Sequence, residues 1–239
     1  PIFQNLSAVA FAPRDMQVSG PTALRITVAG PSHSLITQVQ GQFKGLKVQS
    51  KRSLKGIFSG EVFIKLPLGA VADAARRLQG NGNLMARDGE LTNVNLINKV
   101  QRAAGLVGLS PNERRQATTF KTLEASFVIA DGFADFRQIY LTNPQAEMNG
   151  SGRMTLEQPR LNIAMKVVLA TQASARASKG RTVSFLKDSQ GRIVVPLKIT
   201  GPVENPSVDF DSSKVLQRGS GQLVEKGLGT FFKQLFRNR

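Results

Sequence analysis

The chain has 239 residues, of which 41% are hydrophobic and 20% charged, enough for one large domain or two small ones. It contains no cysteine and a single histidine, His33, which excludes disulfides, thiolate zinc sites, iron–sulfur clusters and multi-histidine metal sites. Its 32 Lys and Arg exceed its 16 Asp and Glu, and the resulting net charge of +16 favours contact with polyanions such as acidic lipid headgroups or nucleic acid.

The first strand-like segments lie in the N-terminal third of the chain. Residues 24–28 and 58–66 alternate between apolar and polar side chains, and only Phe63 breaks the second pattern. Period-two alternation predicts a strand with one apolar and one polar face. The next segment, 68–79, has its apolar residues at helical spacing and stops at Gly80, which predicts a short helix.

Two Asp-Gly pairs, at 88–89 and 131–132, each separate two apolar segments in the middle of the chain. Asp-Gly supplies the positive φ angles of a type I′ turn, so each pair predicts a β-hairpin. Between them, residues 96–106 again show helical spacing and stop at Gly105, which predicts a second short helix.

The alternation is strongest after residue 145. Residues 146–156, 161–169 and 193–199 each predict a strand, and Gln158-Pro159 predicts a hairpin turn between the first two. The small, polar stretch 171–179 shows no periodicity, so we expect a mobile loop there. Strands with one apolar and one polar face are typical of antiparallel sheet, and sequential hairpins make a meander.

The tail has an amphipathic pattern. Apolar residues lie along one helical face from Leu216 to Phe236, basic residues occupy the rest, and four glycines weaken the helix. Such a helix can dock on the sheet, pack against another copy, or lie in a lipid interface. For the third role we expect membrane contact through Lys226, Phe231, Phe232, Lys233 and Phe236.

The sequence offers little for catalysis. His33 lies in a turn-like Gly-Pro-Ser-His-Ser setting, and 80–83 lacks the third glycine and the following helix of a dinucleotide loop. The segment 209–211 reads as a strand end rather than a calcium loop. We therefore expect no enzyme, no catalytic residue, no metal and no cofactor.

The basic run of Lys44, Lys47, Lys51, Arg52 and Lys55 has no interleaved aromatic residues that could stack on bases. It fits a solvated face or an anionic membrane better than nucleic acid, so we expect no nucleic-acid partner.

The order of several motifs resembles the C-terminal region of the AsmA-like family, whose relatives include TamB and other bacterial envelope proteins. The matching stretches, which follow one another along the chain, are Leu78-Gln79-Gly80-Asn81-Gly82 with Arg87-Asp88-Gly89-Glu90-Leu91, Thr119-Phe120-Lys121-Thr122-Leu123 leading to Asp131-Gly132, Asn149-Gly150-Ser151-Gly152, and Val195-Pro196-Leu197 with Gly201-Pro202-Val203-Glu204-Asn205-Pro206. The resemblance covers a little over half of the chain, and each motif is defined mainly by its glycine, proline and aspartate residues.

The resemblance implies a curved antiparallel groove, like that of chorein-type lipid transfer proteins, on a periplasmic protein tethered to the inner membrane. The chain lacks an initiator Met and any stretch of eighteen apolar residues, so we expect an excised segment of a longer anchored chain. We expect residues 1–60 to add N-terminal strands to the sheet, 61–211 to form the AsmA-like β region, and 212–239 to form the basic helical tail.

The predicted fold is therefore mainly β, an antiparallel meander curved into a groove, with short helices at its edge and a C-terminal amphipathic helix. An incompletely covered apolar face would bind phospholipid or another acyl-chain lipid, and the basic surface would meet an anionic membrane. Residues expected to line the groove are Val62, Ile64, Met148, Met154, Leu161, Ile163, Met165 and Val167. Two alternatives stay open: a structural or assembly module with a closed core that recruits anionic partners, and a nucleic-acid binder.

Overall fold

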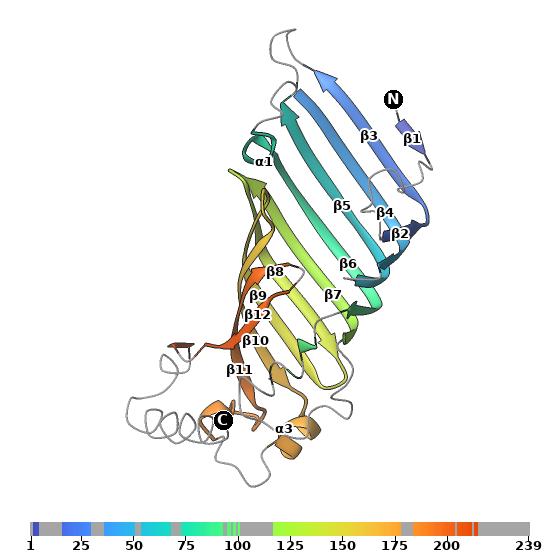
Figure 1. The fold of residues 1–239 in the computed structure, drawn as a ribbon. Coiled ribbons are helices and arrows are strands. Elements are labelled where there is room, and N and C mark those ends of the chain that lie inside the picture. The colour runs from blue at the N-terminus through green and yellow to red at the C-terminus, as the bar shows by residue number, and fades with distance from the viewer. Residues whose placement is uncertain are drawn as a thin grey trace.

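The computed structural model describes residues 2–4, 16–29, 36–50, 54–67, 73–92, 95–96, 98, 100, 117–177, 184–203, 205–211 and 213–214. Within these ranges twelve strands form one antiparallel sheet in the order β1-β3-β4-β5-β6-β7-β8-β9-β10-β11-β12, with β2 paired to β4. The sheet curls without closing, and β1 and β12 lie at its opposite ends (Figure 1). The prediction of a mainly antiparallel β meander is confirmed.

The strands are longest in the middle of the sheet and shorten toward its ends. Their bounds are β1 (Ile2–Gln4), β2 (Met16–Ser19), β3 (Thr22–Ala29), β4 (Ile36–Ser50), β5 (Leu54–Pro67), β6 (Gln79–Thr92), β7 (Ala117–Ala130), β8 (Phe133–Asn143), β9 (Ala146–Thr155), β10 (Arg160–Leu169), β11 (Val194–Pro202) and β12 (Ser207–Phe210). The helical elements with bounds are α1 (Ala74–Arg77), α3 (Thr171–Ala177) and the 3₁₀ turn η2 (Ser184–Leu186). All five segments predicted as strands are confirmed as parts of β3, β5, β9, β10 and β11, although residue 156 lies just after β9 and residue 193 just before β11.

Two of the three predicted hairpins are confirmed. Asp131 and Gly132 join β7 to β8 with φ angles of 51° and 82°, as a type I′ turn requires. The segment with Gln158 and Pro159 joins the antiparallel pair β9 and β10.

The hairpin predicted at Asp88-Gly89 is wrong, because β6 runs through it without a turn. Asp88 has φ 48°, but it lies in a β-bulge. Lys55 pairs with Glu90 and Ile57 with Arg87, so two residues of β6 lie opposite one residue of β5. The bulge shifts the alternation by one position, since Ala86 before it and Leu91 after it both contact the core. The same local chemistry that favours a tight turn thus serves to bend a long strand.

The predicted helices are only partly borne out. In the described part of 68–79, α1 spans four residues, and Gln79 already belongs to β6 because Leu78 adopts an extended conformation. In the segment 96–106, Leu96, Asn98 and Val100 are described and helical.

The expected mobile loop at 171–179 is wrong over its described residues, which form α3. Its buried residues are Ala173, Ser174 and Ala177, small side chains at helical spacing that let the helix approach the sheet closely. A face of small residues produces no apolar periodicity, so the pattern gave no helical signal. The predicted tail helix at 212–239 lies outside the described residues except for Ser213 and Lys214, which are helical.

The expected boundary at residues 60 and 61 falls inside β5, and the sheet continues on both sides of it.

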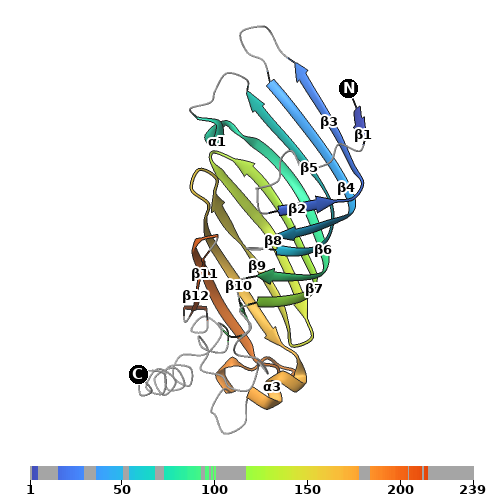
Figure 2. The same cartoon turned by 45° about the vertical axis from the view of Figure 1, so that its right-hand side comes forward.

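Glycines on the apolar face show the direction in which the sheet curls. A Cβ added to Gly60 would lie 2.2 Å from the Asn83 carbonyl oxygen on β6, and one added to Gly152 would lie 2.3 Å from the Asn162 carbonyl oxygen on β10. Gly80 and Gly150 make similar approaches to neighbouring strands. Because the adjacent backbone rises toward the glycine side in each case, the apolar face is the concave one, and the curl is visible in Figure 2.

Gly152→Ala is expected to lower the free energy of unfolding by about 1–3 kcal/mol, because its Cβ would overlap backbone atoms of β10. Gly191→Asn is the control: Gly191 has φ 73°, which asparagine tolerates, and nothing lies within 4 Å of its Cβ position. Urea unfolding curves measure both variants. Equal stability of the two variants would contradict the proposed close approach of β9 and β10.

Candidate functional site

One face of the sheet is predominantly apolar across its strands. Side chains in register across the strands form four rows, each made of apolar residues and glycine. Two of them are Ile26, Val39, Ile64, Gly80, Ile129, Ala134, Met154, Leu161 and Gly201, and Gly41, Val62, Gly82, Phe127, Phe136, Gly152, Ile163, Ile199 and Val208. The other two are Phe43, Gly60, Leu84, Ala125, Ile139, Gly150, Met165, Leu197 and Phe210, and Leu46, Phe58, Ala86, Leu123, Leu141, Met148, Val167 and Val195.

The opposite face is mostly polar over the N-terminal strands, whereas on β10 and β11 it carries the buried Val168, Val194 and Pro196. On β4 the intervening residues are Gln38, Gln40 and Gln42, and on β6 they include Asn81 and Asn83. Phe63, the exception in the β5 pattern, lies on this face, where the Lys65 ammonium sits 5.4 Å from the centre of its ring. A sheet with one solvated face and one apolar face must cover the apolar face with something.

The protein itself covers the C-terminal part of this face. Met148, Val167 and Val195 are fully buried, and Leu96, Val100, Ala173, Ala177 and Leu186 belong to the same buried cluster. We call this part, where α3, η2 and the helical residues 96 and 100 join β8–β11, the sealed end. Several of the largest fully buried side chains lie here, and Figure 1 shows α3 at that end of the sheet.

The remaining part of the apolar face is only half covered. We call it the apolar trough and define it by side chains of intermediate exposure on β3 to β10: Ile26, Val39, Val62, Ile64, Leu66, Leu84, Phe127, Phe136, Met154 and Leu161. Val28, at the β3 end of the same face, is 53% exposed. The Phe127 and Phe136 rings lie 6.1 Å apart in a tilted pair, and the Phe127 ring lies over Gly82, where no Cβ could fit.

The eight residues predicted to line a groove all lie on the apolar face, in two groups. Val62, Ile64, Met154 and Leu161 are half-buried and belong to the trough. The other four belong to the buried core, where a lipid could reach them only if the covering elements moved: Met148, Ile163, Met165 and Val167. Alternation thus predicted which residues lie on the apolar face, but it did not predict which of them are buried by covering elements.

Several trough residues were missed from the sequence. Val39 and its neighbours on β4 alternate with glutamines, a signal that would have revealed the strand. Phe127 lies in an uninterrupted apolar run whose inward face only the register of β7 decides.

The other predicted contact residues are placed only in part. The membrane-contact residues Lys226, Phe231, Phe232, Lys233 and Phe236, and also His33, lie outside the described residues. In the basic run, Lys44 and Lys47 are exposed on β4 and Lys55 is half-buried on β5, while 51 and 52 lie outside the described ranges.

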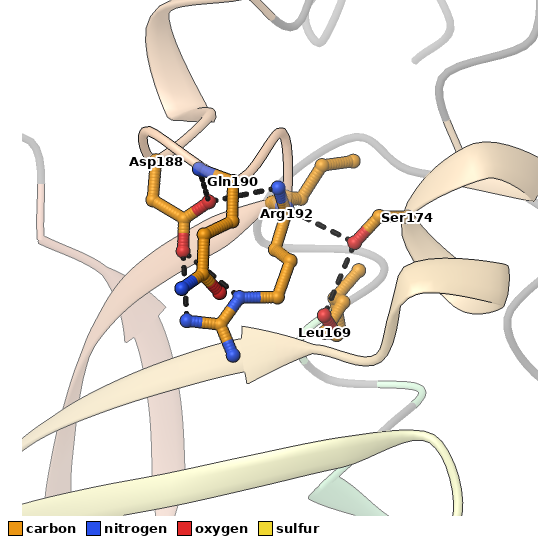
Figure 3. A network of polar contacts seen from close by, with 6 residues as sticks. Leu169, Ser174, Asp188, Gln190 and Arg192 are labelled. Carbon is orange, nitrogen blue, oxygen red and sulfur yellow. Dashed lines mark hydrogen bonds and ion pairs between the residues drawn. The ribbon is translucent and has the colours of Figure 1, made fainter.

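A polar network holds the sealed end together (Figure 3). The buried Ser174 hydroxyl donates to the Leu169 carbonyl at 3.1 Å and accepts the Ile193 N–H at 3.0 Å, so it joins α3 to the ends of β10 and β11. Close by, Asp188 accepts the backbone N–H groups of Gln190 and Arg192 at 3.0 and 2.9 Å, and the Arg192 guanidinium lies 2.9 Å from its other oxygen. The Ser174 hydroxyl and the Asp188 carboxylate together fix the turn that leads into β11.

The Asp188 network predicts a pH dependence of stability. Desolvation acts to raise the pKa of Asp188, but the hydrogen bonds from the Arg192 and Gln190 backbones and the Arg192 guanidinium outweigh it and lower the pKa below the ordinary 3.8. A carboxyl with a lowered folded pKa stabilises the fold above its unfolded pKa, and this contribution is lost as the pH falls through the folded pKa.

Asp188→Asn should therefore be less stable than the parent protein at neutral pH, and the difference should shrink below about pH 3.8. Urea unfolding at a series of pH values from neutral to strongly acidic measures it. A stability difference that stays constant into strong acid would show that the carboxylate charge makes no contribution.

The described residues hold no group of three or more Asp, Glu or His side chains arranged to bind a metal ion. Their helices are also all too short or too polar to cross a membrane. No protein-family model, curated protein or solved structure matches the chain.

Proposed function

We propose that the apolar trough holds the acyl chains of lipids and that the protein is a non-enzymatic lipid-binding or lipid-conducting module of a bacterial envelope protein. The observation that carries this proposal is a concave apolar face that crosses most of the sheet and whose side chains are only half-buried on β3 to β8. Large exposed apolar surfaces on water-soluble folds mark binding sites.

The dimensions of the trough suit an acyl chain. Eight strands from β3 to β10, spaced about 4.8 Å apart, give a path of about 34 Å along the curled sheet. Half of a bilayer's hydrocarbon core, the depth that one leaflet's chains fill, is about 15 Å. The trough is therefore long enough for more than one chain position, and each methylene that leaves water contributes about 0.8 kcal/mol.

The resemblance to the AsmA-like family supports the same role in phospholipid transport between membranes and outer-membrane biogenesis. On this proposal the protein works in the periplasm, joined to an inner-membrane anchor in a longer chain, with the anionic membrane surface as a second partner. The Asp-Gly and Gly-x-Gly motifs that carry the resemblance lie at the β6 bulge, at the β7–β8 turn and at the glycines of β9. These are a bulge, a turn and a close approach between strands.

The second candidate is a structural or assembly module with a closed core. The sealed end favours it, since there the protein fills its own concave face with α3 and the helical residues 96 and 100. The two candidates differ only in what occupies the trough.

Mass spectrometry of the protein extracted from a bacterial envelope in mild detergent tests the proposal. Co-purifying phospholipid at a defined ratio to protein is the expected result. Protein that is folded and free of lipid, and that fails to take up lipid from vesicles, would favour the closed module.

A further inference from the structure

A hollow on the polar face lies between two bulges. β4 has an extra residue opposite β5 between Phe43 and Leu46, and β6 has one opposite β5 at Asp88. The hollow between them has a volume of about 550 Å³. Its lining is Lys44, Gly45, Ile57, Ser59, Met85 and Arg87, together with Phe43, the last residue of the apolar face before the β4 bulge. A second hollow of about 370 Å³ shares Ser59 and Met85, continues toward β7 and β8, and includes Glu124 in its lining.

The lining of the first hollow is cationic and contains no carboxylate. Lys44 and Arg87 supply two positive charges, and Lys47 lies directly across from Ile57, which in turn lies across from Arg87. The ion pairs of the described residues are Arg153–Asp135 and Arg192–Asp188, so none of the three cations is paired within that part of the chain.

The same hollow also exposes apolar surface. Ile57 is 42% exposed between the two cations of its row, and Met85 lies in the next row of the same face, across from Ser59. The Ser59 hydroxyl accepts the Gly45 N–H at 3.0 Å, which leaves its own hydrogen free to donate. Lys, Arg and a hydroxyl donor together suit a tetrahedral anion with several acceptor oxygens, and the apolar patch suits a carbon chain attached to it.

We propose that this hollow binds a phosphate ester, with the phosphate on Lys44, Arg87 and Ser59 and the ester's carbon chain on Ile57 and Met85. The site is separate from the trough, because alternation along β5 and β6 places Ile57 and Met85 on the face opposite Phe58 and Leu84. It therefore does not depend on the proposed lipid-binding role. The phosphate can belong to a soluble ester or to a lipid headgroup at a bilayer surface.

Butyl phosphate, whose chain is too short to fill the trough, is the probe, and isothermal titration calorimetry with the whole chain measures its binding. The double variant Lys44→Ala with Arg87→Ala should weaken binding by about tenfold or more. The matched control is Lys166→Ala with Lys198→Ala, two exposed lysines on the polar face of β10 and β11, and it should leave binding unchanged. Ile57→Ser should remove the preference for butyl phosphate over inorganic phosphate.

Flotation with phosphatidylcholine vesicles, with and without phosphatidic acid, distinguishes the two sources. Loss of phosphatidic-acid-dependent flotation in the double variant but not in the control assigns the site to headgroups. Butyl phosphate binding without flotation assigns it to soluble esters, and either result supports the site. Equal losses in the double variant and the control, or no binding of either probe, would overturn the proposal.

Discussion

Val167→Glu is expected to unfold the protein. Val167 is fully buried in the sealed end, in register with Met148 on β9 and Val195 on β11, which are fully buried as well. A carboxylate there would have no partner, and an unpaired buried charge costs several kcal/mol, comparable to the 5–15 kcal/mol that stabilise a typical domain.

Circular dichroism and limited proteolysis check this result, with Lys166→Glu as the control. Lys166 is the preceding residue on β10, exposed on the polar face, so the same side chain one position away should leave the fold intact. A folded, stable Val167→Glu variant would mean that the sealed end is open to water. Because Val167 is buried whether or not the trough is open, this variant tests the sealing and not the lipid role.

Ile64→Glu is expected to keep the fold and to lose lipid binding. Ile64 is half-buried in the trough, so its carboxylate can reach water, and the loss of stability should be about 1 kcal/mol. The same charge lies where acyl chains would rest and would have to be desolvated by each bound chain. We therefore expect the affinity for a fluorescent fatty acid to fall by about tenfold or more.

Phe63→Glu is the matched control for this prediction. Phe63 is the neighbouring residue on β5, also half-buried, but it lies on the polar face beside Lys65. Its substitution changes the charge and removes apolar area in the same way without entering the trough. Equal losses of fatty-acid binding in the two variants would contradict an apolar-face site, and unfolding of Ile64→Glu would indicate a closed core.

The sequence predicted the parts of the fold that depend on local pattern. Alternation in 161–169 placed β10 and its inward residues correctly, because a strand buried on one face must alternate. Asp131-Gly132 was predictable because few residue pairs adopt two positive φ angles in succession. The identical pair at 88–89 failed, since only the neighbouring strands decide whether such a pair reverses the chain or bulges within it.

The sequence predicted which residues lie on the apolar face, but not which of them the rest of the protein leaves uncovered. Ile163 and Ile64 carry the same local signal, and yet Ile163 is buried under the protein's own elements while Ile64 is half-exposed. The difference is one of tertiary packing, and one element of that packing, α3, was not predicted because its small residues Ala173 and Ala177 hide its helical character in the sequence. Covering is a property of tertiary packing, which alternation along one strand does not contain.

The most direct test of the open trough is to map where a lipid touches the protein. A phospholipid with a photoreactive group at the end of its acyl chain is bound to the protein, and the complex is illuminated. Mass spectrometry then locates the adducts on the protein. We predict adducts on trough residues such as Val39, Ile64 and Phe136, with none on Phe63 of the opposite face or on Val167 of the sealed end. Adducts confined to the polar face, or no adducts on a folded protein, would contradict the account.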